Sequence, residues 1–201
     1  MLVPVKRLAD AKSRLAAAYG SGTRLALQLE LAAGVVAAAS AAPTVDRVVV
    51  ATSDPEASRL AEAVSDGDLP WNEGLAHAIA GLRPRPDAVV ILAGDLPLVC
   101  PDDVEALVRA TPALGVAVAR ARDGGSNGLG LRPPDALMPN FGIPDSAAVH
   151  AQRALGAGLE AVICDRPGLA LDLDTPADLA AVLDRLGPGR IRDLLAPAAV
   201  A

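Results

Sequence analysis

The stretch DAVVILAGDLPLV, residues 87–99, contains an uninterrupted apolar run that ends in Gly94 and Asp95. An apolar run without polar alternation is typical of a central strand that is covered on both faces, as in the sheets of α/β proteins. The stretch therefore predicts a buried central strand. It also predicts that Asp95 lies at the carboxyl edge of the sheet, where ligands bind in α/β proteins.

Strand and helix patterns alternate on both sides of this strand. The expected strands are residues 1–5, 47–53, 115–121, 159–165 and 169–174, and the expected helices are residues 23–41, 54–64, 102–111 and 175–186. Repeated strand and helix units favour an α/β sandwich with a mostly parallel sheet. Residues 66–73 and 123–145 are expected to form loops, and the second is expected to wrap a site without joining the sheet.

The length of 201 residues favours a single domain, residues 1–201, with residues 191–201 as a loose tail. Hydrophobic residues make up 52% of the chain, which is enough for a core, but aromatic residues make up only 1%. A platform of stacking aromatics for nucleic acid is therefore excluded. The formal net charge of -6 argues against a general polyanion-binding surface, so no nucleic-acid partner is expected.

A few local features predict the cellular compartment of the protein and the oxidation state of its cysteines. The chain starts with MLVPVK, which leaves no room for a signal peptide, and the apolar stretch 31–42 is too short to span a bilayer. The two cysteines, Cys100 and Cys164, lack a paired spacing, which favours reduced thiols over a metal site or a disulfide. We expect a cytoplasmic protein without a membrane partner, and a homo-oligomer stays open.

The segment VPVKRLADAKSRL, residues 3–15, concentrates positive charge directly after the expected first strand. Lys6, Arg7, Lys12 and Arg14 lie within nine residues of an otherwise acidic chain. Cations and backbone N–H groups near a helix start suit phosphates. The alternative is that these side chains are simply solvated in a loop.

Three aspartates are expected at the same edge of the sheet. Asp95 follows the central strand, and Asp172 and Asp174 are two residues apart in LDLDTP, so their side chains point to one face of an extended segment. Mg²⁺ favours one or two carboxylates completed by substrate phosphate oxygens. The alternatives are that Asp95 caps the turn before Pro97 and that Asp174 begins the last helix. Together with the cationic segment, the three acids predict a Mg²⁺-dependent phosphate-transfer site.

Missing motifs narrow the chemistry further. The sequence has no G-x-x-x-x-G-K-[ST] and no G-x-G-x-x-G after the first strand, which argues against P-loop and dinucleotide-binding enzymes. The histidines number two, His77 and His150. A phosphate oxygen that attacks an α-phosphate is already ionised at neutral pH, so such a reaction fits a site with many acids and few bases.

Four stretches together resemble one known family. They are VPVKRLADAKSRL (3–15), AGDLP (93–97), FGIPDSAAVH (141–150) and LDLDTPADL (171–179). They are similar to the phosphoenolpyruvate and 2-phospho-L-lactate guanylyltransferases of deazaflavin coenzyme F-420 biosynthesis, members of the nucleotidyltransferase superfamily. The resemblance extends from Val3 to about Leu186. It implies a Rossmann-like three-layer sandwich of the nucleotidyltransferase (glycosyltransferase-A-like) type.

The resemblance also implies an activity and a set of site residues. A phosphate oxygen of a small phosphocarboxylate would attack the α-phosphate of GTP, and pyrophosphate would leave. Lys12, Arg14 and Asp95 would be catalytic, and Asp95, Asp172 and Asp174 would hold Mg²⁺. Ser126, Gly142 and Ser146 would receive the carboxylate of the acceptor. The residues expected to bind the nucleotide are Val5, Lys6, Lys12, Ser13, Arg14 and Gly74.

This chain departs from the family pattern at three places, one of which is residues 66–73, a stretch that is shorter than the family's usual strand and loop there. It reads GLAHAI at residues 74–79, so Ala76 stands where the family has an Asn that helps to hold the nucleotide, and Asn72 or His77 are candidate substitutes. FGIPDS has one more residue between Gly142 and Ser146 than the family's F-G-P-D-S. Three alternatives stay open: a relative that uses molybdopterin or a sugar phosphate, a glycosyltransferase, and a nucleotide-binding protein without catalysis.

Overall fold

The computed structural model describes residues 1–195 of the chain, without the side chain of residue 10. Its sheet has seven strands in the order β3-β2-β1-β4-β6-β5-β7. The strands are β1 (Leu2–Pro4), β2 (Val49–Ala51), β3 (Glu62–Val64), β4 (Val89–Leu92), β5 (Gly115–Arg120), β6 (Ser126–Arg132) and β7 (Glu160–Cys164). The helices are α1 (Ser21–Ala41), α2 (Trp71–Gly81), α3 (Pro101–Ala110), α4 (Ser146–Gly156), α5 (Pro176–Leu183) and α6 (Arg190–Leu195). Short 3-10 helices cover Leu8–Asp10, Ser13–Leu15 and Ala57–Arg59.

The sheet is mostly parallel, as the sequence predicts. β1 pairs in parallel with β2 and β4, β2 with β3, and β5 with β7. β6 runs antiparallel to both of its neighbours, β4 and β5. The carboxyl ends of the parallel strands therefore meet the amino end of β6 at one edge.

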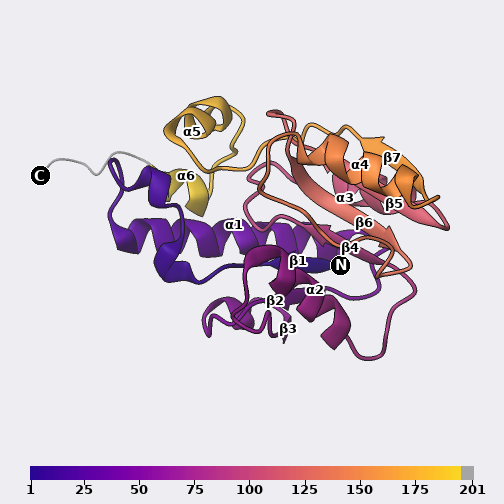
Figure 1. The fold of residues 1–201 in the computed structure, drawn as a ribbon. Coiled ribbons are helices and arrows are strands. Elements are labelled where there is room, and N and C mark those ends of the chain that lie inside the picture. The colour runs from indigo at the N-terminus through magenta and orange to yellow at the C-terminus, as the bar shows by residue number, and fades with distance from the viewer. Residues whose placement is uncertain (196–201) are drawn as a thin grey trace, which may run out of the picture.

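Two hydrophobic layers cover the sheet. In β4, Val90 and Leu92 face the layer that contains α1 and α3, and Val89 and Ile91 face the layer that contains α2 and α4. A strand that is buried on both faces explains the continuous apolar run of the sequence. Figure 1 shows the resulting three layers, with α5 and α6 beyond one end of the sheet near α1.

Helix α1 is a core helix. It is 21 residues long with a hydropathy of 1.3 in its most apolar window, so length and composition alone would allow a membrane span. Its apolar face, which includes Leu31, Ala32 and Val35, is buried inside the protein. α1 contacts β1, α3 and α6.

Two of the expected loop segments contain regular structure. Residues 126–132 form β6 in the interior of the sheet, so the expectation that residues 123–145 stay outside the sheet is wrong. Two glycines make this strand possible: a Cβ at Gly130 would lie 2.0 Å from Thr111 Oγ1, and one at Gly128 would lie 2.8 Å from Leu107 Cδ2. Helix α3 thus packs directly on the backbone of β6. Trp71, expected in a loop, begins α2.

Two expected elements are also different. Residues 54–64 form the 3-10 helix Ala57–Arg59 and the edge strand β3 in place of one helix. Residues 169–174 are not paired in the sheet. The expected loose tail is helical over residues 191–195, within α6, and residues 196–201 lie outside the described part of the chain. Cys100 and Cys164 are free thiols, as expected.

Candidate active site at the carboxyl edge of the sheet

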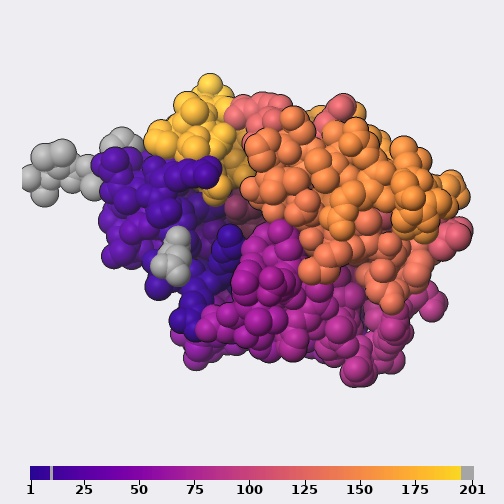
Figure 2. All heavy atoms as spheres, in the orientation of Figure 1, coloured from indigo at the N-terminus to yellow at the C-terminus, as the bar shows by residue number. Residues whose placement is uncertain are grey.

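A cavity of about 390 Å³ lies at this edge of the sheet. Its walls come from the segment after β1, the segment after β4, the start of β6, residues 141–142 and residues 172–174. Figure 2 shows the surface hollowed where the indigo N-terminal segment, the magenta residues around α2 and the orange C-terminal half meet. Below, this cavity is called the cleft.

The N-terminal segment is held in place by buried leucines and by backbone hydrogen bonds. Leu8 and Leu15 are almost fully buried on either side of Lys12. The Leu8 N–H donates to Asp54 Oδ2 at 3.0 Å, and Arg24 Nη1 donates to the Ala11 carbonyl at 2.9 Å. Lys12 itself has a left-handed backbone conformation with φ of 51°. The segment is therefore shaped to turn the Lys12 side chain inward.

The Lys12 ammonium lies between two of the three aspartates. Its Nζ is 2.6 Å from Asp95 Oδ2 and 2.8 Å from Asp174 Oδ1, and the side chain is 2% exposed. Burial alone would lower the pKa of Lys12, but the charges and hydrogen bonds of Asp95 and Asp174 outweigh burial and raise it. Lys12 is therefore charged over the physiological range.

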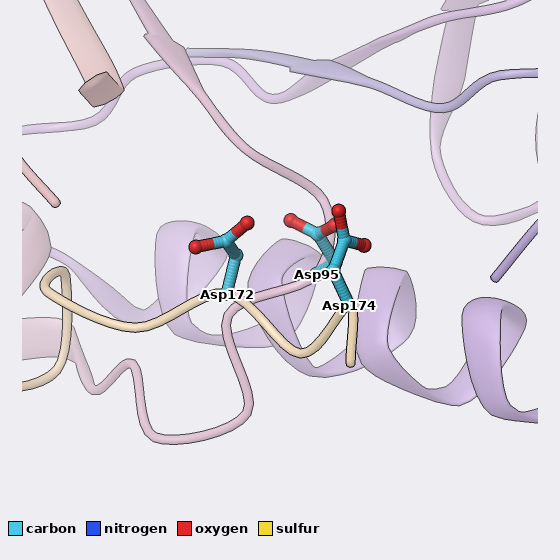
Figure 3. Close-up of side chains that lie close together, drawn as sticks. All are labelled: Asp95, Asp172 and Asp174. Atoms are coloured by element: carbon cyan, nitrogen blue, oxygen red, sulfur yellow. The ribbon is translucent and has the colours of Figure 1, made fainter. Parts of the chain in front are cut away.

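The three aspartates converge, as the sequence predicts. One ligand atom from each of Asp95, Asp172 and Asp174 lies within 4.8 Å of the others. Figure 3 shows the carboxylates pointing to the same side, Asp95 from the segment after β4 and the other two from the segment before α5. Burial and the nearby charges of Asp95 and Asp174 raise the pKa of Asp172 to about 6. A further cation would relieve this repulsion, so the donor set fits a divalent metal ion.

Backbone contacts explain how the aspartates reach one place. The Leu173 N–H donates to the Asp95 carbonyl at 3.1 Å, which joins the two acidic segments. A Cβ at Gly94 would lie 2.9 Å from the Pro4 carbonyl oxygen, so glycine lets the segment after β4 approach the end of β1. Thr175 caps α5 and exchanges hydrogen bonds with Asp178, which leaves the Asp174 carboxylate free for the cleft. The alternative in which Asp174 and Thr175 only begin this helix thus holds for Thr175, whereas the Asp174 carboxylate has Lys12 as its partner.

A further part of the cleft lining consists of Ser126, Asn127, Phe141 and Gly142, below called the serine wall. Asn72 on α2 holds this wall: Phe141 N–H donates to Asn72 Oδ1 at 2.8 Å, and Asn72 Nδ2 donates to the Phe141 carbonyl at 3.1 Å. Asn127 Nδ2 donates to the Leu169 carbonyl at 3.0 Å and approaches Asp172 Oδ1 at 3.4 Å. The three aspartates and the serine wall thus line a single cavity, and Asn127 connects them.

Sequence comparison assigns the chain to a family. The family model described as "Guanylyl transferase CofC like" matches residues 1–187. The chain belongs to this family. The resemblance inferred from the sequence motifs is thereby confirmed, and this CofC-like guanylyl transferase is a nucleotidyltransferase enzyme.

Relatives of this guanylyl transferase include proteins named phosphoenolpyruvate guanylyltransferase. The one from Sphaerobacter thermophilus is 43% identical over 185 residues, 89% of this chain and 89% of the relative. The one from Rubrobacter xylanophilus is 40% identical over 187 residues, 89% of this chain and 90% of the relative.

Solved structures agree on the fold. A structure from Desulfovibrio desulfuricans, named as a nucleotide-diphospho-sugar transferase, has a TM-score of 0.79 at 18% identity and covers 96% of this chain and 92% of its own. A nucleotidyl transferase from Methanothermobacter thermautotroptrophicus has a TM-score of 0.61 at 19% identity and covers 92% of this chain and 97% of its own. The expected nucleotidyltransferase-type sandwich is therefore confirmed.

The cationic residues of this guanylyl transferase lie at the mouth of the cleft, with Lys12 at its base. Lys6, Ser13 and Arg14 line the cleft. Arg14 is exposed and lies 3.8 Å from Asp174 Oδ2. The Lys6 ammonium lies over the Trp71 ring at 4.5 Å from its centroid. Lys6 is thus braced at the rim and carries a positive charge that faces any ligand entering.

Three residues expected at the ligands lie outside the cleft. Val5 is 1% exposed and packs in the core beneath β1. Gly74 lines an adjacent cavity of about 180 Å³, which shares Lys6 and Trp71 with the cleft. Ser146 is 1% exposed and donates its Oγ–H to Ser126 Oγ at 3.1 Å, so it lies behind Ser126. A ligand in the cleft meets Ser126 before Ser146.

The position of Ala76 is different from the expectation. Ala76 lines a separate cavity of about 400 Å³ together with Arg83, Arg85 and residues 134–139. It therefore lines a cavity other than the cleft. Asn72 is committed to Phe141, and His77 is exposed on the outer face of α2. That one of them substitutes for the missing Asn stays a prediction.

The sequence gives a weak signal for several residues of the cleft. The sequence does not predict Asn127 as a site residue, because it follows the glycines of a segment expected to be a loop. Gln28 lies within an apolar helix, where a polar residue signals a buried partner: its Nε2 donates to the Gly94 carbonyl at 3.1 Å. Asn72 was considered for the nucleotide, but its partner is the Phe141 backbone.

Proposed function

We propose that this guanylyl transferase joins GMP from GTP to the phosphate of a small phosphocarboxylate, phosphoenolpyruvate first among them, with Mg²⁺ and release of pyrophosphate. The observation that carries the proposal is that cations, three carboxylates and Ser126 with Gly142 line one cleft. The names of the relatives support phosphoenolpyruvate as the acceptor. By the same family argument, the product serves coenzyme F-420 biosynthesis.

The nucleotide is proposed to bind with its triphosphate against the N-terminal segment. Lys6, Lys12 and Arg14 supply positive charge there, and Ser13 adds a hydroxyl at the start of a 3-10 helix. Charge-assisted hydrogen bonds to phosphate oxygens are short and strong. The charge that develops on the leaving pyrophosphate would meet the same cations.

The three aspartates are proposed to hold Mg²⁺. When bound, the ion supplies Lewis-acid stabilisation of charge on the phosphate oxygens. Asp95, Asp172 and Asp174 provide hard oxygen ligands, which Mg²⁺ prefers. Burial is the largest cause of the raised pKa of Asp172, and the nearby charges of Asp95 and Asp174 raise it further, which a bound cation would offset.

The acceptor is proposed to bind against Ser126 and the Gly142 backbone. Its phosphate oxygen attacks the α-phosphorus of GTP, a new P–O bond forms, the bond to the β-phosphate breaks, and pyrophosphate leaves. The nucleophile is already ionised, so no side chain has to remove a proton. The absence of a histidine among the residues that line the cleft agrees with such a reaction.

The test is pyrophosphate release by the purified protein with Mg²⁺. GTP or ATP is offered with phosphoenolpyruvate, 2-phospholactate, 3-phosphoglycerate or a sugar phosphate in turn. The proposal expects release that requires both GTP and one phosphocarboxylate, and that stops with a chelator. Release without any acceptor, or with the sugar phosphate alone, would overturn it.

Asp95→Asn tests the metal assignment in the same assay. Turnover is expected to fall by at least about 100-fold, because a ligand to the proposed metal ion and a partner of Lys12 is lost. Asp102→Asn, the same change at an exposed position in the first turn of α3, is the matched control and is expected to keep wild-type turnover. Equal turnover of the two variants would contradict the assignment.

A further inference from the structure

A buried hydrogen-bond chain lies directly behind the serine wall of the cleft. Ser126 Oγ lies 3.0 Å from His150 Nδ1 and accepts from Ser146 Oγ–H at 3.1 Å. On the other side of the imidazole, the Asn140 N–H donates to His150 Nε2 at 2.9 Å. His150 is 0% exposed, so these contacts define its surroundings.

The positions of the protons follow from this geometry. A backbone N–H always donates, so His150 Nε2 is an acceptor and carries no proton. In a neutral imidazole the proton is then on Nδ1, which donates to Ser126 Oγ. Ser126 Oγ therefore accepts two hydrogen bonds, from His150 and from Ser146, and both of its lone pairs are used. Its own O–H has one direction left, toward the cleft that Ser126 lines.

From this proton arrangement we infer that His150 is a positioning residue that fixes the Ser126 hydroxyl as an obligate hydrogen-bond donor to an anionic oxygen of the acceptor. His150 does not touch the ligand and transfers no proton. Its effect is to remove the choice between donor and acceptor that a serine hydroxyl normally has. The inference rests on the proposed function, because it assigns the specificity of the acceptor side of the same cleft.

The surroundings of His150 support the neutral imidazole. Burial, together with the charge of Arg153, lowers the pKa of His150 to about 4, against a small opposing effect of the Ser146 backbone. The Phe141 ring packs edge-on against the imidazole at a centroid distance of 5.2 Å. Asn140 directly precedes Phe141 and Gly142, so the same imidazole holds both the hydroxyl and the backbone of the serine wall.

The consequence for specificity is that Ser126 favours oxygen atoms that only accept. A carboxylate oxygen accepts from the fixed donor in a charge-assisted hydrogen bond, whereas the oxygen of a neutral hydroxyl accepts in a weaker one. An acceptor with a carboxylate next to its phosphate is therefore preferred over a phosphate ester of a neutral alcohol.

Two isosteric variants test the two ring nitrogens of His150 one at a time: Nδ1, the donor to Ser126, and Nε2, the acceptor from the Asn140 N–H. The side-chain amide of His150→Asn falls near Nδ1 and keeps a donor to Ser126, whereas that of His150→Gln falls near Nε2 and keeps a partner for the Asn140 N–H. The KM for phosphoenolpyruvate is expected to rise roughly 10- to 100-fold in His150→Gln and much less in His150→Asn. The KM for GTP is expected to change less than about twofold in both.

A double-mutant cycle tests whether His150 acts through Ser126. Ser126→Ala is expected to raise the KM for phosphoenolpyruvate as much as His150→Gln does. Adding His150→Gln to Ser126→Ala is expected to change that KM by less than about twofold further. Equal KM values for His150→Asn and His150→Gln, or additive effects in the cycle, would overturn the inference.

The tautomer is also measurable without turnover. His77→Gln leaves His150 as the single histidine of the 201-residue chain, so its ring ¹⁵N resonances need no further assignment. The expected spectrum is that of a neutral, Nδ1-protonated imidazole from pH 5 to 8. An Nε2-protonated ring, or a charged ring at pH 6, would overturn the inference even if no substrate pair gives pyrophosphate. Failure of every substrate pair with the expected tautomer would instead count against the proposed function.

Discussion

Lys12 is held by Asp95 and Asp174 at the base of the cleft, and its side chain is 2% exposed. A buried ammonium is costly unless its charge is compensated, and removing one partner of a buried ion pair leaves the other uncompensated. Without this ammonium, the carboxylates of Asp95, Asp172 and Asp174 would repel one another more strongly. Even with it, burial and the charges of Asp95 and Asp174 raise the pKa of Asp172. Lys12 is therefore a structural cation as well as a proposed ligand for the triphosphate.

Lys12→Met tests this structural role. Without divalent metal, the variant is expected to lose about 2 kcal/mol of stability, because three carboxylates are left without their cation. Mg²⁺ is expected to restore more stability to the variant than it adds to wild type. Thermal unfolding with and without Mg²⁺ measures both effects.

Lys6→Met is the control for that experiment, since the Lys6 ammonium lies over Trp71 and not between carboxylates. It is expected to unfold at nearly the wild-type temperature. The structural role is refuted if Lys6→Met and Lys12→Met respond equally to Mg²⁺.

Asp172 gives the protein a distinct pH dependence. Its pKa of about 6 lies above the value of about 4 for an unfolded aspartate, so the folded state binds the proton more tightly. The contribution of Asp172 to stability is therefore largest below about pH 4 and is lost as pH rises to about 6. Asp172→Asn removes this loss and is expected to stabilise the metal-free protein at pH 7 by about 1–2 kcal/mol.

Denaturant unfolding at pH 4, 5, 6 and 7 measures this effect. The difference between Asp172→Asn and wild type is expected to grow with pH and to become constant above about pH 6. A difference that is independent of pH would show that Asp172 ionises normally. Divalent metal is expected to reduce the difference at pH 7, because only wild type has all three carboxylates.

The acidic residues of the site were predictable because each lies next to a recognisable strand or helix signal. Asp95 ends the most apolar stretch of the chain, and Asp172 and Asp174 precede a capped helix. The partners of Asn72, Asn127 and Gln28 were not predictable. Each of these side chains bonds to backbone of a segment distant in the sequence, and sequence spacing carries no information about such contacts.

At the scale of elements, α2 and the segment 139–145 are joined by one side chain. Asn72 makes two hydrogen bonds to the backbone of Phe141, next to Gly142 of the cleft. Neither partner belongs to the sheet, so this pair of bonds fixes the position of Phe141 and Gly142 relative to α2.

Asn72→Ala is expected to loosen this part of the serine wall. Stability is expected to fall by about 1–2 kcal/mol, because two polar backbone groups lose their partners. The KM for the acceptor is expected to rise while the KM for GTP changes little. Steady-state kinetics with each substrate varied in turn measures this difference, and Glu73→Ala, an exposed change in the same helical turn, is the control.

The elements that the sequence predicts wrongly have identifiable physical causes. The start signal at Asp54 is genuine, since Asp54 Oδ1 accepts from the Glu56 and Ala57 N–H groups. The helix ends early because residues 62–64 pair with β2 as an edge strand. In β6, glycine lowers strand propensity, but the close approach of α3 requires it. Tertiary packing overrides the local signal in both cases.

At the scale of the whole molecule, α6 joins the C-terminal part of the described chain to α1. Leu195 is 4% exposed and packs with Leu15, Leu27 and Leu31. Tyr19 Oη donates to the Leu195 carbonyl at 3.1 Å, and Arg190 Nε lies 2.8 Å from Glu30 Oε1. This helix lies beyond residue 187, where the match to the family model ends.

Leu195→Ala is expected to lower the free energy of unfolding by about 2–3 kcal/mol, because a buried leucine is truncated. kcat is expected to remain at the wild-type value, since Leu195 is not among the residues that line the cleft. Chemical unfolding and a turnover assay on the same preparation measure the two quantities. Asp193→Ala, on the exposed side of α6, is expected to change neither; a similar loss in both variants would mean that α6 contributes no packing energy.

The reversed direction of β6 has a consequence for how such a protein tolerates change. Ser126 is the first residue of β6 and follows a short turn, residues 121–125, that joins it to β5. A single-residue insertion in that turn would shift the pairing of β6 by one and move Ser126 to the opposite face of the sheet. An insertion after the strand, in residues 133–145, leaves the pairing of β6 unchanged and alters only the length of the segment that carries Phe141 and Gly142. New acceptor preferences are therefore expected to arise through the length of the second segment, while the turn before Ser126 keeps its length.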